Sequence, residues 1–174
     1  MLTSDKSTTE IDPGKFWRLM GMRPVGAAVV AASHLDVPAG LLALSVSHVT
    51  ASPSSVLVCV GSNAGALPAI KAAGSFAISY LPADGAEIAE VFGGRRGLSG
   101  ADRFASGQWL RLRTGAPVFA DAVLALDCRV SATFVHEDTE IIVGHIVDYA
   151  SNEERAPLIA YHGRYRALTL ENEQ

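Results

Sequence analysis

Three long segments near the carboxyl end of the chain are rich in branched residues, and they limit the possible folds more than any other feature. They span residues 122–135, 140–150 and 157–168. Branched side chains favour extended strands, and hairpin-like turns separate the segments. Because only two or three short helical patterns interrupt the rest of the chain, we expect a mainly β protein, an antiparallel barrel with short helices.

A second informative stretch, residues 40–61, reads GLLALSVSHVTASPSSVLVCVG. We interpret it as two strands joined by a Ser/Pro corner. Small hydroxyl side chains with apolar neighbours suit a flat polar heterocycle, which needs apolar cover and a few hydrogen bonds. The same hydroxyls can instead satisfy local backbone groups in an ordinary barrel strand. These residues leave both interpretations open: Ser45, Ser47, Thr50, Ser52, Ser54 and Ser55.

The size of the chain predicts one domain with a substantial core, since it has 174 residues and 49% of them are hydrophobic. We assign residues 1–11 to a flexible arm and residues 12–170 to the domain. Charged residues make up only 18% of the chain. Some apolar surface should therefore be buried between subunits, which favours a homodimer.

Several classes of partner are disfavoured by composition. The formal charge of −4 and the pI near 5.7 give no basic surface for nucleic acid. Cys59 and Cys128 lie in apolar runs, as expected for buried, unpaired thiols in a reducing cytoplasm. The sequence contains no CxxC or HExxH spacing, so we do not expect a zinc site. No run approaches the roughly 18 apolar residues of a membrane span, so we expect a cytoplasmic protein.

Local signals place the remaining elements. Asp12 and Pro13 mark the start of a short amphipathic helix that ends near Gly21. The apolar run 25–32 predicts a strand covered on both faces. Residues 34–40 read as a hairpin loop longer than the tightest kinds. Further along, we expect helices at 67–73 and 85–92 and a strand at 75–81.

Two loops are candidates for binding an anion. Residues 61–66 are small and polar and lead into a predicted helix, whose first N–H groups are free to bind a phosphate. Residues 93–100 are glycine-rich and contain Arg95 and Arg96, and such cations can close over a phosphate or pyrophosphate. The second loop reads equally well as a solvated surface loop.

Taken together, these motifs resemble the flavin reductase-like, FMN-binding split-barrel family, from about Asp12 to Leu168. The resemblance implies a dimeric split barrel that reduces free FMN or FAD with NADH or NADPH and often supplies a separate monooxygenase. The matching features are Gly40 with the corner 45–53, VLVCV at 56–60, the segment 69–78, Phe92-Gly93, Asp102-Arg103-Phe104 with Trp109, Gly115-Ala116-Pro117, Asp121-Ala122, Cys128, the segment 143–146, Pro157-Leu158, Tyr161 and the segment 163–165.

The same resemblance implies which residues meet the flavin. Members of the family usually carry T-x-N-S or T-x-S-S where this chain has LALS at 42–45, so backbone groups of Ala43 and Leu44 would meet the ring edge. The segment 61–66 and the loop that contains Arg95 and Arg96 would bind the phosphate. The implied cofactor-binding residues are Ala43, Leu44, Ser45, Ser47, Ser62, Asn63, Phe92, Arg95 and Arg96.

One departure concerns the nicotinamide side of the site. Family reductases usually read G-D-H where this chain has Glu137, Asp138 and Thr139. Threonine can form a hydrogen bond but cannot carry a proton or a positive charge at neutral pH. Hydride transfer needs no acid from the protein, so the change should weaken activity without abolishing it. We therefore name Asp138, Thr139 and His48 as catalytic candidates, with His48 and His136 as possible substitutes for the missing histidine.

Three functions are consistent with these residues. The first is an NAD(P)H-dependent flavin reductase that supplies reduced flavin to a partner monooxygenase. The second is a tailoring enzyme on the same fold that acts on a small aromatic or polyketide-like substrate, with or without flavin. The third is a non-catalytic binding protein of the same barrel, either a flavin carrier or an interaction module. The sequence does not choose between FMN and FAD or between NADH and NADPH.

Overall fold

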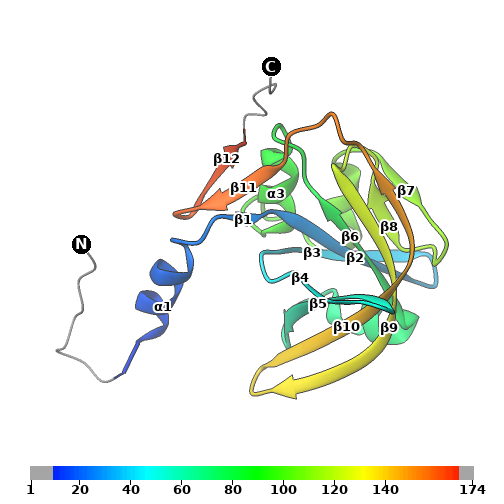
Figure 1. Ribbon diagram of the computed structural model, residues 1–174, viewed down its shortest axis with the longest axis horizontal. Coiled ribbons are helices and arrows are strands. Elements are labelled where there is room, and N and C mark those ends of the chain that lie inside the picture. The colour runs from blue at the N-terminus through cyan, green and yellow to red at the C-terminus, as the bar shows by residue number, and fades with distance from the viewer. Residues whose placement is uncertain (1–9, 169–174) are drawn as a thin grey trace.

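The computed structural model describes residues 10–168 (Figure 1). Its helices are α1 (Pro13–Met20), α2 (Leu67–Ala73), α3 (Ala86–Phe92) and the 3-10 helix η1 (Gly100–Ala105). Its strands are β1 (Val25–Gly26), β2 (Ala28–His34), β3 (Val37–Ala43), β4 (Ser47–Ala51), β5 (Ser54–Gly61), β6 (Ser75–Tyr80), β7 (Trp109–Arg111), β8 (Pro117–Phe119), β9 (Leu124–His136), β10 (Thr139–Ser151), β11 (Leu158–Tyr161) and β12 (Arg164–Ala167). Most of the predicted arm 1–11, and residues 169–170 of the predicted domain, lie outside the described residues.

Seven strands form one antiparallel sheet in the order β3-β2-β6-β9-β10-β5-β4. Its two end strands, β3 and β4, are consecutive in the chain. The short link between them is fastened to β5, because the Ser45 hydroxyl both accepts from the Cys59 amide (3.2 Å) and donates to the Cys59 carbonyl (3.1 Å). The sheet therefore curls back on itself, and the predicted antiparallel barrel is confirmed. A small sheet, β1-β11-β12, and the hairpin β7-β8 complete the fold.

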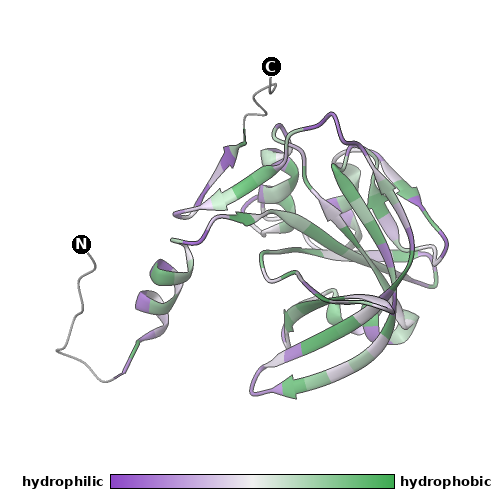
Figure 2. Cartoon of the chain, in the orientation of Figure 1, coloured by the Kyte–Doolittle hydropathy of each residue, from purple (hydrophilic) through white to green (hydrophobic). Residues whose placement is uncertain are grey.

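The core lies on both sides of β2. Because side chains alternate along a strand, Ala28, Val30 and Ala32 pack into one hydrophobic cluster, whereas Val29 and Ala31 pack into another. Helix α2 contacts β2 and β6, while α3 contacts β2 and β3. The predicted burial of this strand on both faces is confirmed. Figure 2 shows that hydrophobic positions also follow the long strands β9 and β10.

Three expectations about strands and turns need correction. The loop after β2 is a two-residue turn, Leu35 and Asp36, both with left-handed φ values of 50° and 61°. This is the backbone of the tightest hairpin turns, and Val37 to Gly40 belong to β3. The segment 157–168 is a hairpin that turns at His162 and Gly163, not one strand. The stretch 40–61 contains parts of three strands, because the chain leaves the sheet briefly between β3 and β4.

Both cysteines are free, as predicted. Cys128 is fully buried, and burial together with the neighbouring Asp127 carboxylate raises the pKa of its thiol to about 12. The thiol therefore stays protonated at neutral pH and acts as an apolar core residue. Cys59 is half-buried, contrary to the expectation for it. Among residues 10–168, no helix is long and apolar enough to span a membrane.

Candidate flavin site

The link between β3 and β4 holds the first group of predicted site residues. Ala43 is buried, whereas Leu44 is 41% exposed. Ser45 is half-buried, and its hydroxyl is already engaged with the backbone of β5. The exposed Ser47 hydroxyl donates weakly to the neighbouring His48 carbonyl (3.3 Å). A ring bound at this corner would therefore meet Leu44, Ser47 and backbone groups, rather than a free Ser45 hydroxyl.

The second group lies where β5 ends beside the turn between β9 and β10. The Ser62 amide donates to the Asp138 carbonyl (2.7 Å), which fastens the segment 61–66 to that turn. Ser62 and Asn63 are exposed. A Cβ atom added at Gly61 or Gly65 would meet no atom within 4 Å, so the surface of this segment is open. A phosphate group at this surface would meet the exposed Ser62 and Asn63 side chains, because the Ser62 and Ala64 amides already donate to the Asp138 and Gly61 carbonyl groups.

The strand register shows which of the two candidate histidines lies next to Thr139. Thr139 is paired with Gly61 on one side and with His136 on the other, so the side chains of Thr139 and His136 share one face of the sheet. His48 is paired with Val56, whose side chain is buried in the core, and therefore belongs to the opposite face. The structure brings His136, but not His48, to the altered motif. The Thr139 hydroxyl donates to a carboxylate oxygen of Asp138 (3.3 Å).

The two loop arginines contact other parts of the molecule. The Arg95 guanidinium donates to the Gly163 carbonyl (3.5 Å) and lies 5.6 Å from the centre of the Tyr165 ring. Partial burial raises the pKa of Tyr165, and the nearby Arg95 charge opposes this shift. Arg96 forms an ion pair with Glu90 (2.7 Å). The Arg95 contacts hold the glycine-rich loop against the β11–β12 hairpin, whereas the Arg96 ion pair ties the loop to α3. None of these contacts reaches the segment 61–66.

Phe92 is a core residue in this structure. Its side chain is 2% exposed. Its ring packs edge-on against Phe104, with ring centres 5.1 Å apart, and in a tilted arrangement against Trp109, with ring centres 5.2 Å apart. A Cβ atom at Gly40 would lie 2.7 Å from the Phe92 ring, so glycine is needed where β3 crosses it. The expected contact between the Phe92 side chain and a cofactor is not supported by this burial.

Arg103 organises this region, and the sequence interpretation gave it no role. Its guanidinium donates to the carbonyl groups of Gly40 (3.0 Å), Phe92 (3.3 Å) and Leu98 (3.0 Å). One side chain thus ties β3, the end of α3 and the glycine-rich loop together. The Asp102-Arg103-Phe104 motif was the only available signal, and it does not reveal these distant partners.

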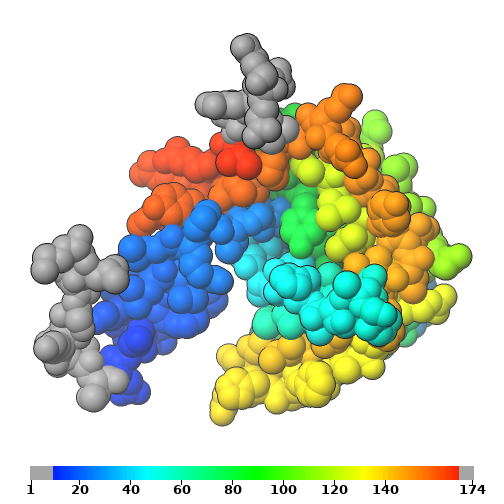
Figure 3. Space-filling view, viewed as in Figure 1, coloured from blue at the N-terminus to red at the C-terminus, as the bar shows by residue number. Residues whose placement is uncertain are grey.

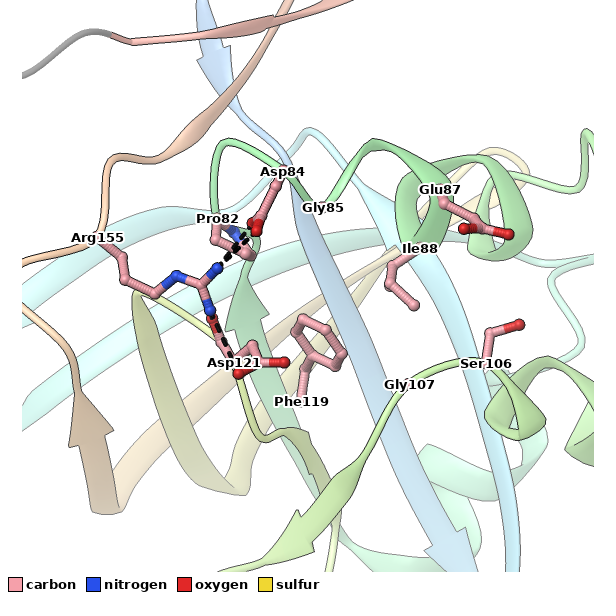
Figure 4. Close-up of a pocket in the computed structure, with 10 residues that line it drawn as sticks. All are labelled: Pro82, Asp84, Gly85, Glu87, Ile88, Ser106, Gly107, Phe119, Asp121 and Arg155. Carbon is pink, nitrogen blue, oxygen red and sulfur yellow. Dashed lines mark hydrogen bonds and ion pairs between the residues drawn. The ribbon is translucent and has the colours of Figure 1, made fainter.

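A separate cavity of about 380 Å³ lies at the start of α3 (Figure 4). Phe119 and Ile88 line it together with a charged wall in which Arg155 forms ion pairs with Asp84 (2.7 Å) and Asp121 (3.2 Å). None of the predicted site residues lines this cavity. Within residues 10–168, no group of three or more histidine, cysteine or acidic side chains is arranged to hold a metal ion.

Comparison with known proteins places this arrangement in a family. The sequence profile of the flavin reductase like domain matches residues 20–169, which is most of the chain. The chain belongs to the flavin reductase-like family. The corner at 42–45 and Thr139 both lie within the matched residues and are therefore parts of a flavin reductase-like domain.

Individual relatives show how the family's members differ. The chain is 35% identical to an FMN reductase (NADH), RutF, of Agrobacterium fabrum, over 84% of either chain. It is 31% identical to the actinorhodin polyketide dimerase of Streptomyces coelicolor, over 90% of this chain and 87% of the other. Its fold matches BorF, the flavin reductase component of a bacterial two-component tryptophan halogenase, with a TM-score of 0.85 at 27% identity. That match covers 92% of this chain and all of BorF.

Proposed function

We propose that this protein transfers hydride from NADH or NADPH to free FMN or FAD and delivers the reduced flavin to a separate oxygenase or halogenase. The proposal rests mainly on one observation. The exposed segment 61–66 lies against the turn before Thr139, and the link between β3 and β4 is next to both. Relatives that act as an NADH-dependent FMN reductase and as the reductase component of a halogenase support it. The test is flavin-stimulated consumption of NADH or NADPH.

The residues of the site have separate roles in this proposal. Leu44 and the backbone of the link cover the flavin ring, while Ser62 and Asn63 bind its phosphate. Thr139 and His136 face the nicotinamide. The two nucleotides hold the redox chemistry, so the protein contributes proximity, orientation and local charge. A protein that works with reduced nicotinamide and free flavin is expected in the cytoplasm.

We further propose that the protein acts as a homodimer, because α1 carries an apolar surface that the rest of residues 10–168 leaves exposed. None of the eight residues of α1 is buried, and Trp17 is 70% exposed. The side chains of Phe16 and Trp17 pack edge-on against each other, with ring centres 5.1 Å apart. A helix this short is unstable without packing. Figure 3 shows the molecule hollowed between α1 and the β9–β10 hairpin, where a second copy has room to dock.

A Trp17→Glu variant is expected to shift the protein from dimer to monomer, because a carboxylate would replace the largest exposed apolar side chain of α1. Sedimentation equilibrium measures the change. Leu110→Glu is the matched control, since Leu110 is also exposed (56%) but lies on β7. The dimer assignment is wrong if the unmodified protein sediments as a monomer, or if both variants dissociate equally.

A second candidate function is a tailoring enzyme that acts on a polyketide-like substrate. The similarity to the polyketide dimerase and the apolar residues Leu42 and Leu44 at the ring corner favour it. Protein that copurifies with flavin yet consumes no reduced nicotinamide would support this function over the first.

A further inference from the structure

A partly buried ion pair lies next to the proposed nicotinamide side of the site. The Lys71 ammonium, on the last turn of α2, contacts one carboxylate oxygen of Glu140, the second residue of β10, at 2.7 Å. Glu140 is only 8% exposed, whereas the Lys71 side chain is 58% exposed. The other Glu140 oxygen is buried and has no hydrogen-bond partner.

The two partners depend on this ion pair to different degrees, because Glu140 is buried and Lys71 is exposed. A buried carboxylate is costly unless it is paired. In the described part of the chain, Lys71 is the one group recorded in contact with either of its oxygens. Removing the ammonium would leave a buried, uncompensated charge, which the protein can relieve by moving the start of β10 toward water. Lys71 itself is largely solvated and does not require the pair.

The start of β10 is where the proposed site needs a fixed geometry. Glu140 directly follows Thr139, whose cross-strand neighbours are Gly61 and His136. The adjacent turn is also held by the hydrogen bond from the Ser62 amide to the Asp138 carbonyl. Two contacts, one from Ser62 just after β5 and one from Lys71 on the last turn of α2, therefore fix the turn that presents Thr139 and His136.

We propose that Lys71 and Glu140 are positioning residues for the nicotinamide side of the site. The ion pair holds the first residues of β10 in place, so that Thr139 and His136 meet the hydride donor in a single arrangement. This inference rests on the proposed reductase function. It predicts that the pair affects use of the nicotinamide more than binding of the flavin, which meets the link between β3 and β4 and the segment 61–66.

The test compares Lys71→Met with the unmodified protein. We expect kcat/KM for NADH to fall about fivefold, while the Kd for FMN, measured by quenching of FMN fluorescence, stays within about twofold. Lys71→Arg should retain most of the activity, because arginine preserves the charge. Glu140→Gln removes the buried charge and is therefore expected to fold. It should lower kcat/KM for NADH in the same direction.

Arg155→Met is the control for a loss of stability alone. It breaks the ion pairs with Asp84 and Asp121 at the separate cavity (Figure 4), and should lower the Tm without changing kcat/KM for NADH. If Lys71→Met behaves like Arg155→Met, the ion pair has only a structural role and the inference is overturned. If the unmodified protein consumes no NADH with any flavin, the reductase proposal itself fails, and this inference fails with it.

Discussion

Replacing Gly144 by alanine is expected to lower the free energy of unfolding by about 3 kcal/mol, as overpacking of a tight core does. A Cβ atom at this position would lie 2.6 Å from the Phe76 ring and 2.9 Å from the Cβ atom of Cys128. Both neighbours are fully buried, so neither can move aside into solvent. The residue also borders a register shift between β9 and β10, where the backbone is already constrained.

Urea unfolding followed by circular dichroism measures this loss of stability. Gly26→Ala is the matched control, because a Cβ atom there would make ordinary contacts with Tyr80, the closest at 3.4 Å. We expect this control to change the free energy of unfolding by less than about 1 kcal/mol. Equal stabilities for the two variants would contradict the close packing of Gly144 against Phe76.

The second large effect is expected at His136. His136→Ala should lower kcat/KM for NADH roughly 30-fold, because it removes the imidazole that lies next to Thr139 on the proposed nicotinamide side of the site. His48→Ala should leave kcat/KM within about twofold, since strand register assigns His48 to the opposite face of the sheet. The stopped-flow rate of NADH oxidation in the presence of FMN measures both.

A double variant makes this prediction about His136 more specific. If the imidazole is what matters, Thr139→His added to His136→Ala should restore much of the lost activity, because the two positions are cross-strand neighbours. Equal losses in His136→Ala and His48→Ala would mean that strand register does not determine which histidine serves the nicotinamide.

The fold was largely readable from the sequence because its strongest signals are local. Branched residues at 122–135 and 140–150 predicted the two longest strands, β9 and β10, within a few residues. A hairpin turn was predicted at 34–40, but its two-residue length was missed because neither Leu35 nor Asp36 is a glycine, although both adopt left-handed φ values. The turn at His162 was missed for a similar reason, since a non-glycine residue takes the first left-handed position.

The site was only partly readable, because its geometry depends on contacts between distant segments. Sequence patterns indicated the segment 61–66 and the turn near Thr139, but only the register of β5, β9 and β10 shows that they adjoin. Arg95 was predicted to bind phosphate, because the sequence does not reveal its contact with Gly163, 68 residues away. The Lys71–Glu140 pair spans 69 residues and has no local signature.

Consumption of NADH by the purified protein, with and without added flavin, tests the reductase proposal most directly. The rate should rise with the concentration of FMN or FAD and then saturate, because the proposed function uses the flavin as a substrate that enters and leaves. Parallel titrations with NADPH identify the preferred donor. A rate of NADH or NADPH oxidation that no flavin increases would contradict the proposed function.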